Sequence, residues 1–272
     1  MKIRHEDLIG TYEQKRKAVS GFNLMDDTFF AVVLEDREAC EYLLSALMGK
    51  PIKLIENKTQ YSIRNIESHS VVLDALVEDQ DHRLFNVEIQ VGDKGNHERR
   101  LRCYQTAIDW SCLQKGIDYK NMPELYMIFI SNFDPFGKNK NFYEIGQYVK
   151  GCNLDYDDGV HKLYFNTAVI DDTELSKLLQ YLANSDAANQ SFGALSKAVA
   201  YHKIDNKGVD VMCKAVEEYA YERELFGKSK GKIETQLETV KNMLKKGFEL
   251  DIALDLVNMD KDTYNKYAKS MQ

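Results

Sequence analysis

Two short segments rich in β-branched and aromatic residues constrain the fold of this chain more than any other feature. Residues 71–77 and 84–91 have the length and composition of strands, and the polar stretch Gln80–His82 separates them. A polar break this short between two strands predicts an antiparallel hairpin. The chain must therefore fold around a sheet that contains this hairpin.

The segments around the hairpin predict the order helix, three strands, helix, strand, with additions. From about residue 171 the pattern is helical. We therefore expect a core at 1–170, a helical extension packed on that core at 171–227, and an amphipathic helical tail at 228–272. The expected elements are a helical leader to about residue 17, a capping segment at 23–27 before the apolar run 29–34, a helix at 37–48, extended chain at 52–63, the two hairpin strands, a helix at 96–114, strands at 125–130, 142–149 and 162–166, and helices at 173–183, 190–202, 209–226, 230–246, 251–257 and 261–268.

The register of the hairpin brings two acidic residues together. If Gln80–His82 forms the loop, Asp79 pairs with Arg83, and Asp74 then lies opposite Glu88, since the residue numbers of both pairs have the same sum. Like charges directly opposite each other destabilise a sheet by up to about 1 kcal/mol, which calls for a compensating cation. Mg²⁺ fits two carboxylates because water and substrate phosphate complete its shell. A loop of two or four residues would place the acids on opposite faces.

The two faces of the second hairpin strand differ in polarity, because side chains alternate along a strand. One face is purely apolar and is expected to be the buried one. It consists of Phe85, Val87, Ile89 and Val91, whereas Leu84, Asn86, Glu88 and Gln90 share the other face. Either acid alone is typical of a solvated strand residue, but two acids at a matching register beside a polar residue indicate a site.

Four segments follow the order and spacing of a known nuclease family. They are Asn23-Leu24-Met25-Asp26-Asp27-Thr28-Phe29-Phe30, Val72-Leu73-Asp74-Ala75-Leu76, Phe85-Asn86-Val87-Glu88-Ile89-Gln90, and Arg99-Arg100-x-Arg102-x-Tyr104. With these segments, the region from about residue 20 to 220 resembles the recombination-promoting nuclease and transposase family of the PD-(D/E)xK superfamily. The resemblance implies an α/β, restriction-endonuclease-like core, with a central mixed sheet flanked by helices and a helical C-terminal region.

The same resemblance implies the site residues. Carried over by position, the strand acid falls on Asp74, the E-x-Q motif on Glu88 and Gln90, and the helical acid on Asp26 in preference to Asp27. Asp74, Glu88 and Asp26 are the implied metal ligands, and Gln90 orients the attacking water. Gln90 stands where the superfamily usually has lysine, and glutamine supplies no positive charge. Activity is therefore weak, or another basic residue substitutes.

Basic residues after the hairpin are candidates for contacts with DNA. Arg99 and Arg102 are about one turn apart on the expected helix, Tyr104 adds a hydroxyl group, and Lys94 precedes the helix. Such side chains contact the phosphate backbone in DNA-binding proteins. The alternative is a solvated helix face whose arginines pair with nearby acids.

The resulting expectation is a magnesium-dependent DNA endonuclease (with manganese as an alternative metal) that hydrolyses phosphodiester bonds in recombination or transposition. The alternative is a catalytically weak or silent protein that keeps the nuclease fold and oligomerises through its C-terminal helices. The absence of the lysine and the net charge of −7 favour this alternative, because binding to a polyanion rewards positive charge.

Several other functional classes find no support in the sequence. No apolar run approaches the roughly 18 residues of a membrane span, and no signal peptide is recognisable, so a cytoplasmic protein is expected. The five cysteines form no C-x-x-C pair and are expected as free thiols. The histidines lack metal-ligand spacing, and no serine has a nucleophile-elbow motif, which argues against zinc chemistry and hydrolase triads.

The tail contains one amphipathic stripe. Ile233, Leu237, Val240 and Leu244 recur at helical spacing and need a partner. Either the stripe packs on its own domain, or it forms a short coiled coil in a homodimer through residues 228–246. The last two predicted helices are a further candidate for docking a partner; their four aspartates argue against DNA.

Overall fold

The computed structural model describes residues 5–64, 70–113, 118–152 and 154–268. They belong to two compact units, which meet between Ala215 and Val216 along the chain. Each unit has its own apolar core, so the two are described separately.

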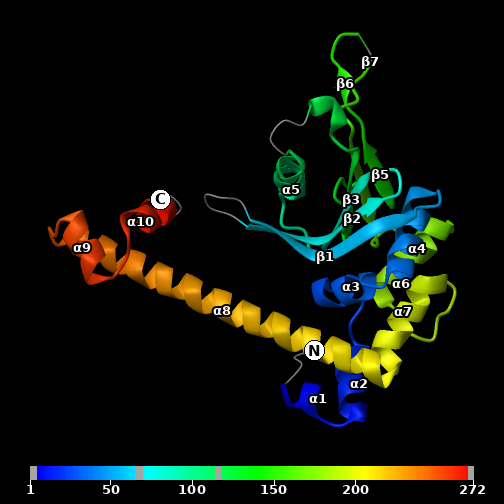
Figure 1. Cartoon of the computed structure of the whole chain (residues 1–272), viewed down its shortest axis with the longest axis horizontal. Coiled ribbons are helices and arrows are strands. Elements are labelled where there is room, and N and C mark those ends of the chain that lie inside the picture. The colour runs from blue at the N-terminus through cyan, green and yellow to red at the C-terminus, as the bar shows by residue number, and fades with distance from the viewer. Residues whose placement is uncertain (1–4, 65–69, 114–117, 153, 269–272) are drawn as a thin grey trace. The chain divides into compact units, whose positions relative to one another are not determined.

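A six-stranded mixed sheet forms the centre of the first unit (Figure 1). Its strand order is β1–β2–β3–β4–β8–β5, with parallel pairing of β3 with β4 and of β4 with β8, and antiparallel pairing elsewhere. This confirms the expected mixed sheet of a PD-(D/E)xK nuclease-like fold. The strands are β1 (Leu54–Arg64), β2 (Ser70–Asp79), β3 (Leu84–Gln90), β4 (Leu125–Ser131), β5 (Phe142–Ile145) and β8 (Val160–Asn166).

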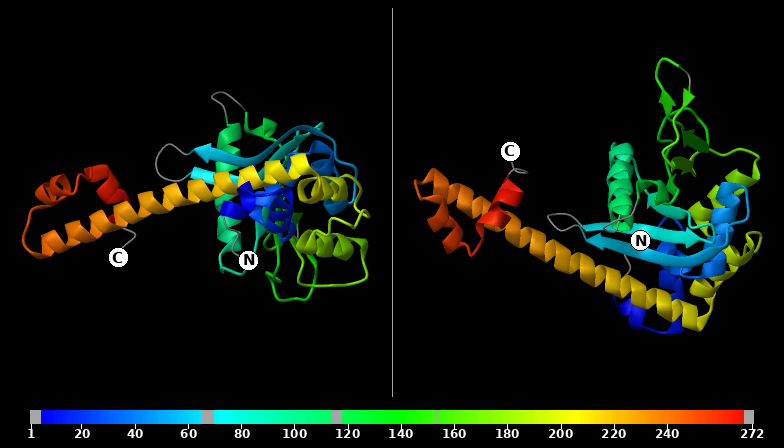
Figure 2. Two further views of the ribbon diagram at one scale, coloured as in Figure 1. Left: turned by 90° about the horizontal axis from the view of Figure 1, so that it is seen from below. Right: turned by 45° about the horizontal axis from the view of Figure 1, so that its top comes forward.

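The hairpin of β2 and β3 has the predicted register. Ala75 lies opposite Val87 and Glu78 opposite Leu84, and the backbone N–H of Asp79 donates to the carbonyl of Arg83 at 3.1 Å. One step beyond the Ala75–Val87 pair, the same register reaches Asp74 and Glu88. β1 lies along the other side of β2, and both are long strands (Figure 2).

Helices cover both faces of the sheet. Helix α5 (His97–Cys112) lies on one face, where its Leu101 and Ile108 pack with Leu125, Met127 and Phe129 of β4. Helices α3 (Asp27–Leu34) and α4 (Arg37–Met48) contact β1 and β2, and they lie on the other side of the sheet in Figure 1. The expectation that only the apolar face of β3 is buried is therefore wrong, because α5 covers the polar face as well.

The remaining helices of the first unit surround α3 and α4. The expected leader helix is divided into α1 (His5–Ile9) and α2 (Tyr12–Ser20), with a Thr11 cap between them; its first four residues lie outside the described ones. Helix α4 begins at its Asp36 cap and ends at Gly49, which has φ 63°. Helices α6 (Glu174–Asn184) and α7 (Gly193–Ile204) follow β8, and α7 contacts α2, α3 and α4. The end of the predicted helix 96–114, at Gln114, lies outside the described residues.

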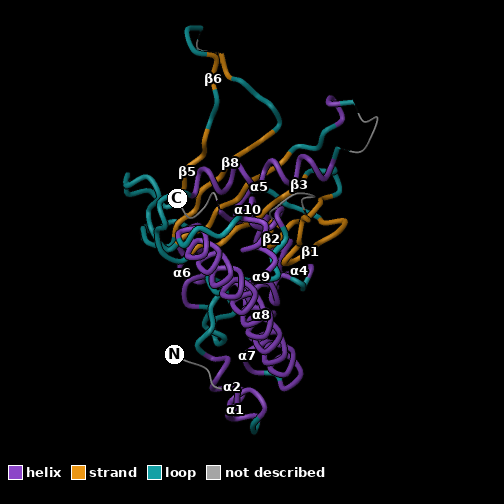
Figure 3. Tube along the Cα trace, turned by 90° about the vertical axis from the view of Figure 1, so that its left-hand side faces the viewer, coloured by secondary structure: helices purple, strands orange, loops and turns teal. Residues whose placement is uncertain are grey.

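A small hairpin replaces the second half of the strand predicted at 142–149. After β5, the chain leaves the sheet and forms β6 (Tyr148–Val149) and β7 (Leu154–Asp155), which pair with each other. This hairpin projects away from the sheet (Figure 3). Its side chains are exposed, so the alternation used to recognise buried strands carries no signal there. A short 3₁₀ helix, Tyr119–Asn121, precedes β4.

Helix α8 (Asn206–Lys245) continues through the break expected between residues 226 and 230. Gly227 and Gly231 each cost a helix only about 1 kcal/mol, whereas a proline would have ended it. In the second unit, Leu237 and Val240 of α8 pack with Ala253 and Leu254 of α9 (Leu250–Leu256), together with Met259 and residues of α10 (Lys261–Ala268). The amphipathic stripe thus has a partner within its own chain. No helix in the described part of the chain combines the length and apolar character of a membrane span.

Candidate active site

Asp74 in the middle of β2 and Glu88 near the end of β3 lie together, as the register predicts. The backbone N–H of Ile89 donates to Oδ2 of Asp74 at 2.9 Å, and the backbone N–H of Asp74 donates to Oε1 of Glu88 at 3.4 Å. Each carboxylate therefore reaches across to the opposite strand. Nδ2 of Asn86 also donates to Oε1 of Glu88, at 3.2 Å, and holds that carboxylate from its own strand.

Both carboxylates resist ionisation. Burial raises the pKa of Asp74 from an ordinary 3.8 to about 6, although the Ile89 N–H lowers it, and Asp27 adds to the rise. Burial and the charge of Asp74 raise the pKa of Glu88 well above its usual range. Glu88 is fully buried, so little water screens the repulsion between the two acids. A bound cation would relieve this repulsion.

Arg100 on α5 is the basic residue that enters the site. Its Nη2 donates to Oε2 of Glu88 at 3.2 Å, and its Nη1 donates to Oε1 of Gln90 at 3.1 Å. The third nitrogen, Nε, donates to the hydroxyl group of Tyr104 at 3.0 Å, and the guanidinium carbon lies 5.2 Å from the centre of that ring. Burial lowers the pKa of Arg100, but Tyr104 and Glu88 outweigh burial and raise it above its ordinary value. Arg100 is therefore charged across the working pH range.

Gln90 is buried at the end of β3 and turns its amide towards the helix. Its Nε2 donates to the carbonyl of Gly92 at 3.0 Å, while its Oε1 accepts from Arg100. The glutamine is thus part of the cluster of acids, but both ends of its amide have protein partners.

The two helical acids differ in their surroundings. Oδ2 of Asp26 accepts the backbone N–H of Asn23 at 2.8 Å, which closes the turn before α3. Asp27 is exposed at the first position of α3, and its charge contributes to the raised pKa of Asp74. The charge of Asp27 therefore acts on Asp74, while Asp26 is engaged in the turn.

The chemistry of the pair suits a hard divalent cation with few protein ligands. Among residues 5–64, 70–113, 118–152 and 154–268, no group of three or more His, Cys, Asp or Glu side chains is arranged to hold a metal ion. Two carboxylates match Mg²⁺ or Mn²⁺, since such ions complete their shell with water and phosphate oxygens. A zinc or calcium site would need more ligands than the pair provides.

The predicted DNA-contacting residues lie outside the acid cluster, apart from Tyr104. Arg99, Arg102 and Lys94 are exposed, and none of the three has an ion-pair partner in the described part of the chain. Tyr104 is half-buried, and its hydroxyl group accepts from Arg100. Its hydroxyl thus belongs to the candidate active site.

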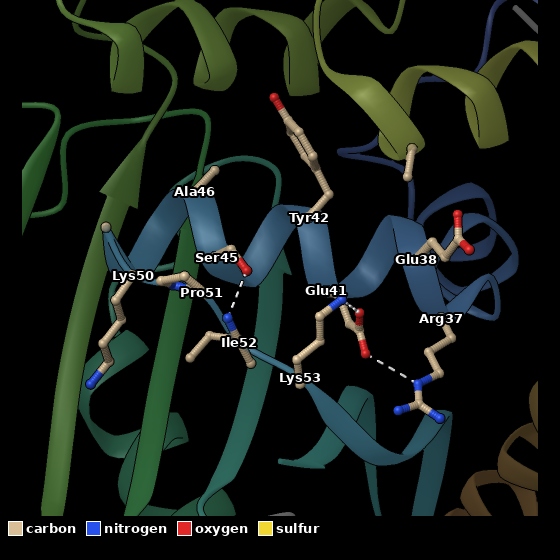
Figure 4. Close-up of a pocket in the computed structure, with 12 residues that line it drawn as sticks. Arg37, Glu38, Glu41, Tyr42, Ser45, Ala46, Lys50, Pro51, Ile52 and Lys53 are labelled. Atoms are coloured by element: carbon tan, nitrogen blue, oxygen red, sulfur yellow. Dashed lines mark hydrogen bonds and ion pairs between the residues drawn. The ribbon is translucent and has the colours of Figure 1, made fainter. Parts of the chain in front are cut away.

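A surface cavity lies away from the acid pair. It has a volume of about 890 Å³ and lies along α4 and the segment that leads from α4 into β1 (Figure 4). Its one buried carboxylate, Glu41, is bound by Lys53 at 2.6 Å, Arg37 at 3.1 Å and the backbone N–H of Leu54 at 3.0 Å. Those contacts join α4 to β1, so Glu41 has a structural role.

The mixed sheet and its flanking helices are consistent with a PD-(D/E)xK nuclease-like fold. Residues 29–156 match the family described as PD-(D/E)XK nuclease family transposase. The matched region includes the acid pair, Gln90 and the whole of α5, and it supports a nuclease- or transposase-like function. No curated protein and no solved structure matches the chain.

Arg100 and Asn86 are the participants that sequence reasoning did not single out. Arg100 was present within the arginine-rich motif, but three arginines within four residues cannot be told apart without knowing how α5 is rotated about its axis. Asn86 had a usable signal, because it lies two residues before Glu88 and so shares its face.

Proposed function

We propose that the first unit is a metal-dependent DNA endonuclease that hydrolyses phosphodiester bonds at Asp74 and Glu88. The observation that carries the proposal is the pair of carboxylates at matching positions of β2 and β3, each fixed by a hydrogen bond from the opposite strand, with Glu88 fully buried and Asp74 partly buried. The match of residues 29–156 to a nuclease family of transposases supports DNA as the substrate.

The contacts of each residue in the candidate active site suggest its role. Asp74 and Glu88 would hold the divalent ion, most simply Mg²⁺ or Mn²⁺, and Asn86 keeps the Glu88 carboxylate in place. Bound there, such an ion polarises the scissile phosphate and lowers the pKa of an attacking water. Gln90, which faces the same side of β3, would orient that water through the second N–H of its Nε2, since the first donates to the carbonyl of Gly92.

Asp27 is the helical acid that we assign to the site, in place of Asp26. Its exposed carboxylate bears on Asp74 through charge, and it would accept a proton or bind a water at the edge of the site. Arg99, Arg102 and Lys94 would contact the DNA backbone around the site, because exposed cations with no ion-pair partner among the described residues are available for phosphates.

The test compares nicking of supercoiled plasmid DNA by the full chain and by Asp74→Asn and Glu88→Gln, in Mg²⁺ and in Mn²⁺. Loss of one carboxylate should reduce the rate by about a hundredfold to a thousandfold, as for other groups that stabilise a charged transition state. Asp81→Asn is the matched control, since Asp81 is an exposed acid in the loop of the same hairpin. Equal rates in all four proteins would contradict the site.

A further inference from the structure

Gln90 leaves the candidate site without the positive charge that a lysine at this position supplies to the transition state. Hydrolysis of a phosphodiester adds a water oxygen to phosphorus, breaks one bridging P–O bond and returns a proton to the leaving oxygen. Negative charge accumulates on the non-bridging oxygens during this exchange. A neutral amide stabilises that charge less than a cation does.

We infer that Arg100 of α5 is the cation that contacts the scissile phosphate in place of that lysine. The inference rests on the proposed function, and it adds a catalytic residue that lies outside the strand motif. Arg100 is the basic side chain that the structure places against both Glu88 and Gln90, at 3.2 and 3.1 Å.

The hydrogen-bond inventory of Arg100 leaves room for a phosphate. A guanidinium group has five N–H donors, of which Glu88, Gln90 and Tyr104 occupy one each among the described residues. The remaining donors are on the two terminal nitrogens, and the side chain is 29% exposed. Arginine presents such donors in a plane, as a fork that matches two phosphate oxygens.

The three contacts also fix where the cation lies. Tyr104, one turn further along α5, accepts from Nε and stacks its ring near the guanidinium, so the side chain is held from its own helix. Glu88 and Gln90 hold it from the strand. A cation with three anchors is preorganised, which is the condition under which a donor contributes most to a charged transition state.

The same geometry predicts opposite effects on cleavage and on metal binding. Arg100 is a counter-ion of Glu88, so its charge opposes the binding of a divalent cation to that carboxylate. Removing the charge should strengthen metal binding while it weakens catalysis. A residue that only supports the structure would weaken both.

The experiment uses the full chain as wild type, Arg100→Gln and Arg100→Lys. The control is Arg223→Gln, because Arg223 also donates to a tyrosine one turn away, Tyr219, at 3.1 Å with a ring contact at 5.5 Å, but has no carboxylate partner of the site. Three quantities are measured: the plasmid nicking rate at saturating DNA, the affinity for a labelled DNA duplex in Ca²⁺, and the affinity for Mn²⁺ without DNA by titration calorimetry.

Arg100→Gln should lower the nicking rate by about a hundredfold or more at nearly unchanged DNA affinity, and should raise Mn²⁺ affinity several-fold. Arg100→Lys, which keeps the charge but loses the fork, should fall between this variant and wild type. Arg223→Gln should match wild type in all three measurements.

A nicking rate for Arg100→Gln within about threefold of wild type overturns the inference, since a transition-state donor is worth far more. So does a parallel fall in rate and in Mn²⁺ affinity, because that is the behaviour of a supporting residue. A failure of the proposed function gives a different result. The wild type then does not nick DNA, and Asp74→Asn binds Mn²⁺ as the wild type does. In that case the role assigned to Arg100 is also wrong.

Discussion

The two faces of β3 are buried to the same degree but serve different purposes. Phe85, Val87 and Ile89 are apolar, and Phe85 stacks on Tyr126 of the neighbouring strand with ring centres 4.9 Å apart. On the face towards α5, Glu88 and Asn86 are equally buried but polar. Burial of an apolar side chain stabilises the fold, whereas burial of a carboxylate beside another carboxylate costs free energy unless a cation is present. One face of β3 thus stabilises the fold, and the other face holds the candidate site residues.

The largest difference between the two faces of β3 is expected when one residue on each face is substituted and the free energy of unfolding is measured. Phe85→Ala should lower the free energy of unfolding by about 3 to 5 kcal/mol, through lost apolar burial and a cavity in the core. Glu88→Gln should leave it unchanged or raise it, because the substitution removes a buried charge whose pKa is raised by burial and by Asp74. Urea denaturation followed by circular dichroism measures both values.

A loss of stability in Glu88→Gln as large as that of Phe85→Ala would break the comparison. It would show that the ion pair with Arg100 contributes more than the burial of the carboxylate costs. The nicking assay also distinguishes the two faces. Phe85→Ala should retain activity at temperatures where the protein stays folded, whereas Glu88→Gln should not.

A similar division between a packed and an exposed side applies to the amphipathic stripe of α8. Leu237 and Val240 are buried against α9 and its neighbours, while Leu244, the last residue of the same stripe, is 36% exposed. Leu237→Ala should therefore destabilise the helical tail by about 2 to 4 kcal/mol, whereas Leu244→Ala should cost less than about 1 kcal/mol.

Hydrogen exchange is the appropriate measurement, because it reports on α9 and α10 separately from the sheet. In Leu237→Ala the amides of these two helices should lose protection, while those of β3 and β4 should not. If the stripe instead held two chains together, protection in the wild type would rise with protein concentration, which the intrachain packing does not predict.

The sequence predicts the strands that carry the acid pair better than it predicts which helix covers them. The register of β2 and β3 followed from the length of one polar loop, and it placed Asp74 and Glu88 correctly because antiparallel pairing leaves no freedom once the loop is known. The strands and helices with a strong period, such as α4 and β4, were predicted within one residue of their ends.

The predictions that were wrong or incomplete share a physical cause. In each case the burial or the role of a residue depends on a neighbouring helix or strand. The burial of Asn86 and Glu88 depends on α5 lying over them, and the strand itself looks half solvated. The choice among three arginines depends on the rotation of α5, which apolar residues such as Leu101 and Ile108 determine by their packing. The sequence of β3 or of α5 alone therefore does not predict a site that is formed by side chains of both.

A pH-dependent effect is expected at Asp74, the less buried member of the acid pair. Its pKa is raised to about 6 by burial, so the folded chain holds a proton that the unfolded chain releases above an ordinary pKa of 3.8. The stabilisation by protonated Asp74 is complete below pH 3.8 and is lost as the pH rises to about 6. Asp74→Asn cannot titrate, so it should exceed the wild type in unfolding free energy by about 3 kcal/mol at pH 7 and by less than about 1 kcal/mol at pH 4.

Thermal or urea unfolding at a series of pH values tests this difference, with Asp81→Asn as the exposed control. Added Mn²⁺ should reverse the order of stability at pH 7, because a cation favours the ionised carboxylate of the wild type and has less to bind in Asp74→Asn. A gap between the two proteins that is constant with pH would mean that Asp74 is ionised throughout. The polar face of β3 would then be compensated by Arg100 alone, and the contrast between the two faces of the strand would be smaller than their burial suggests.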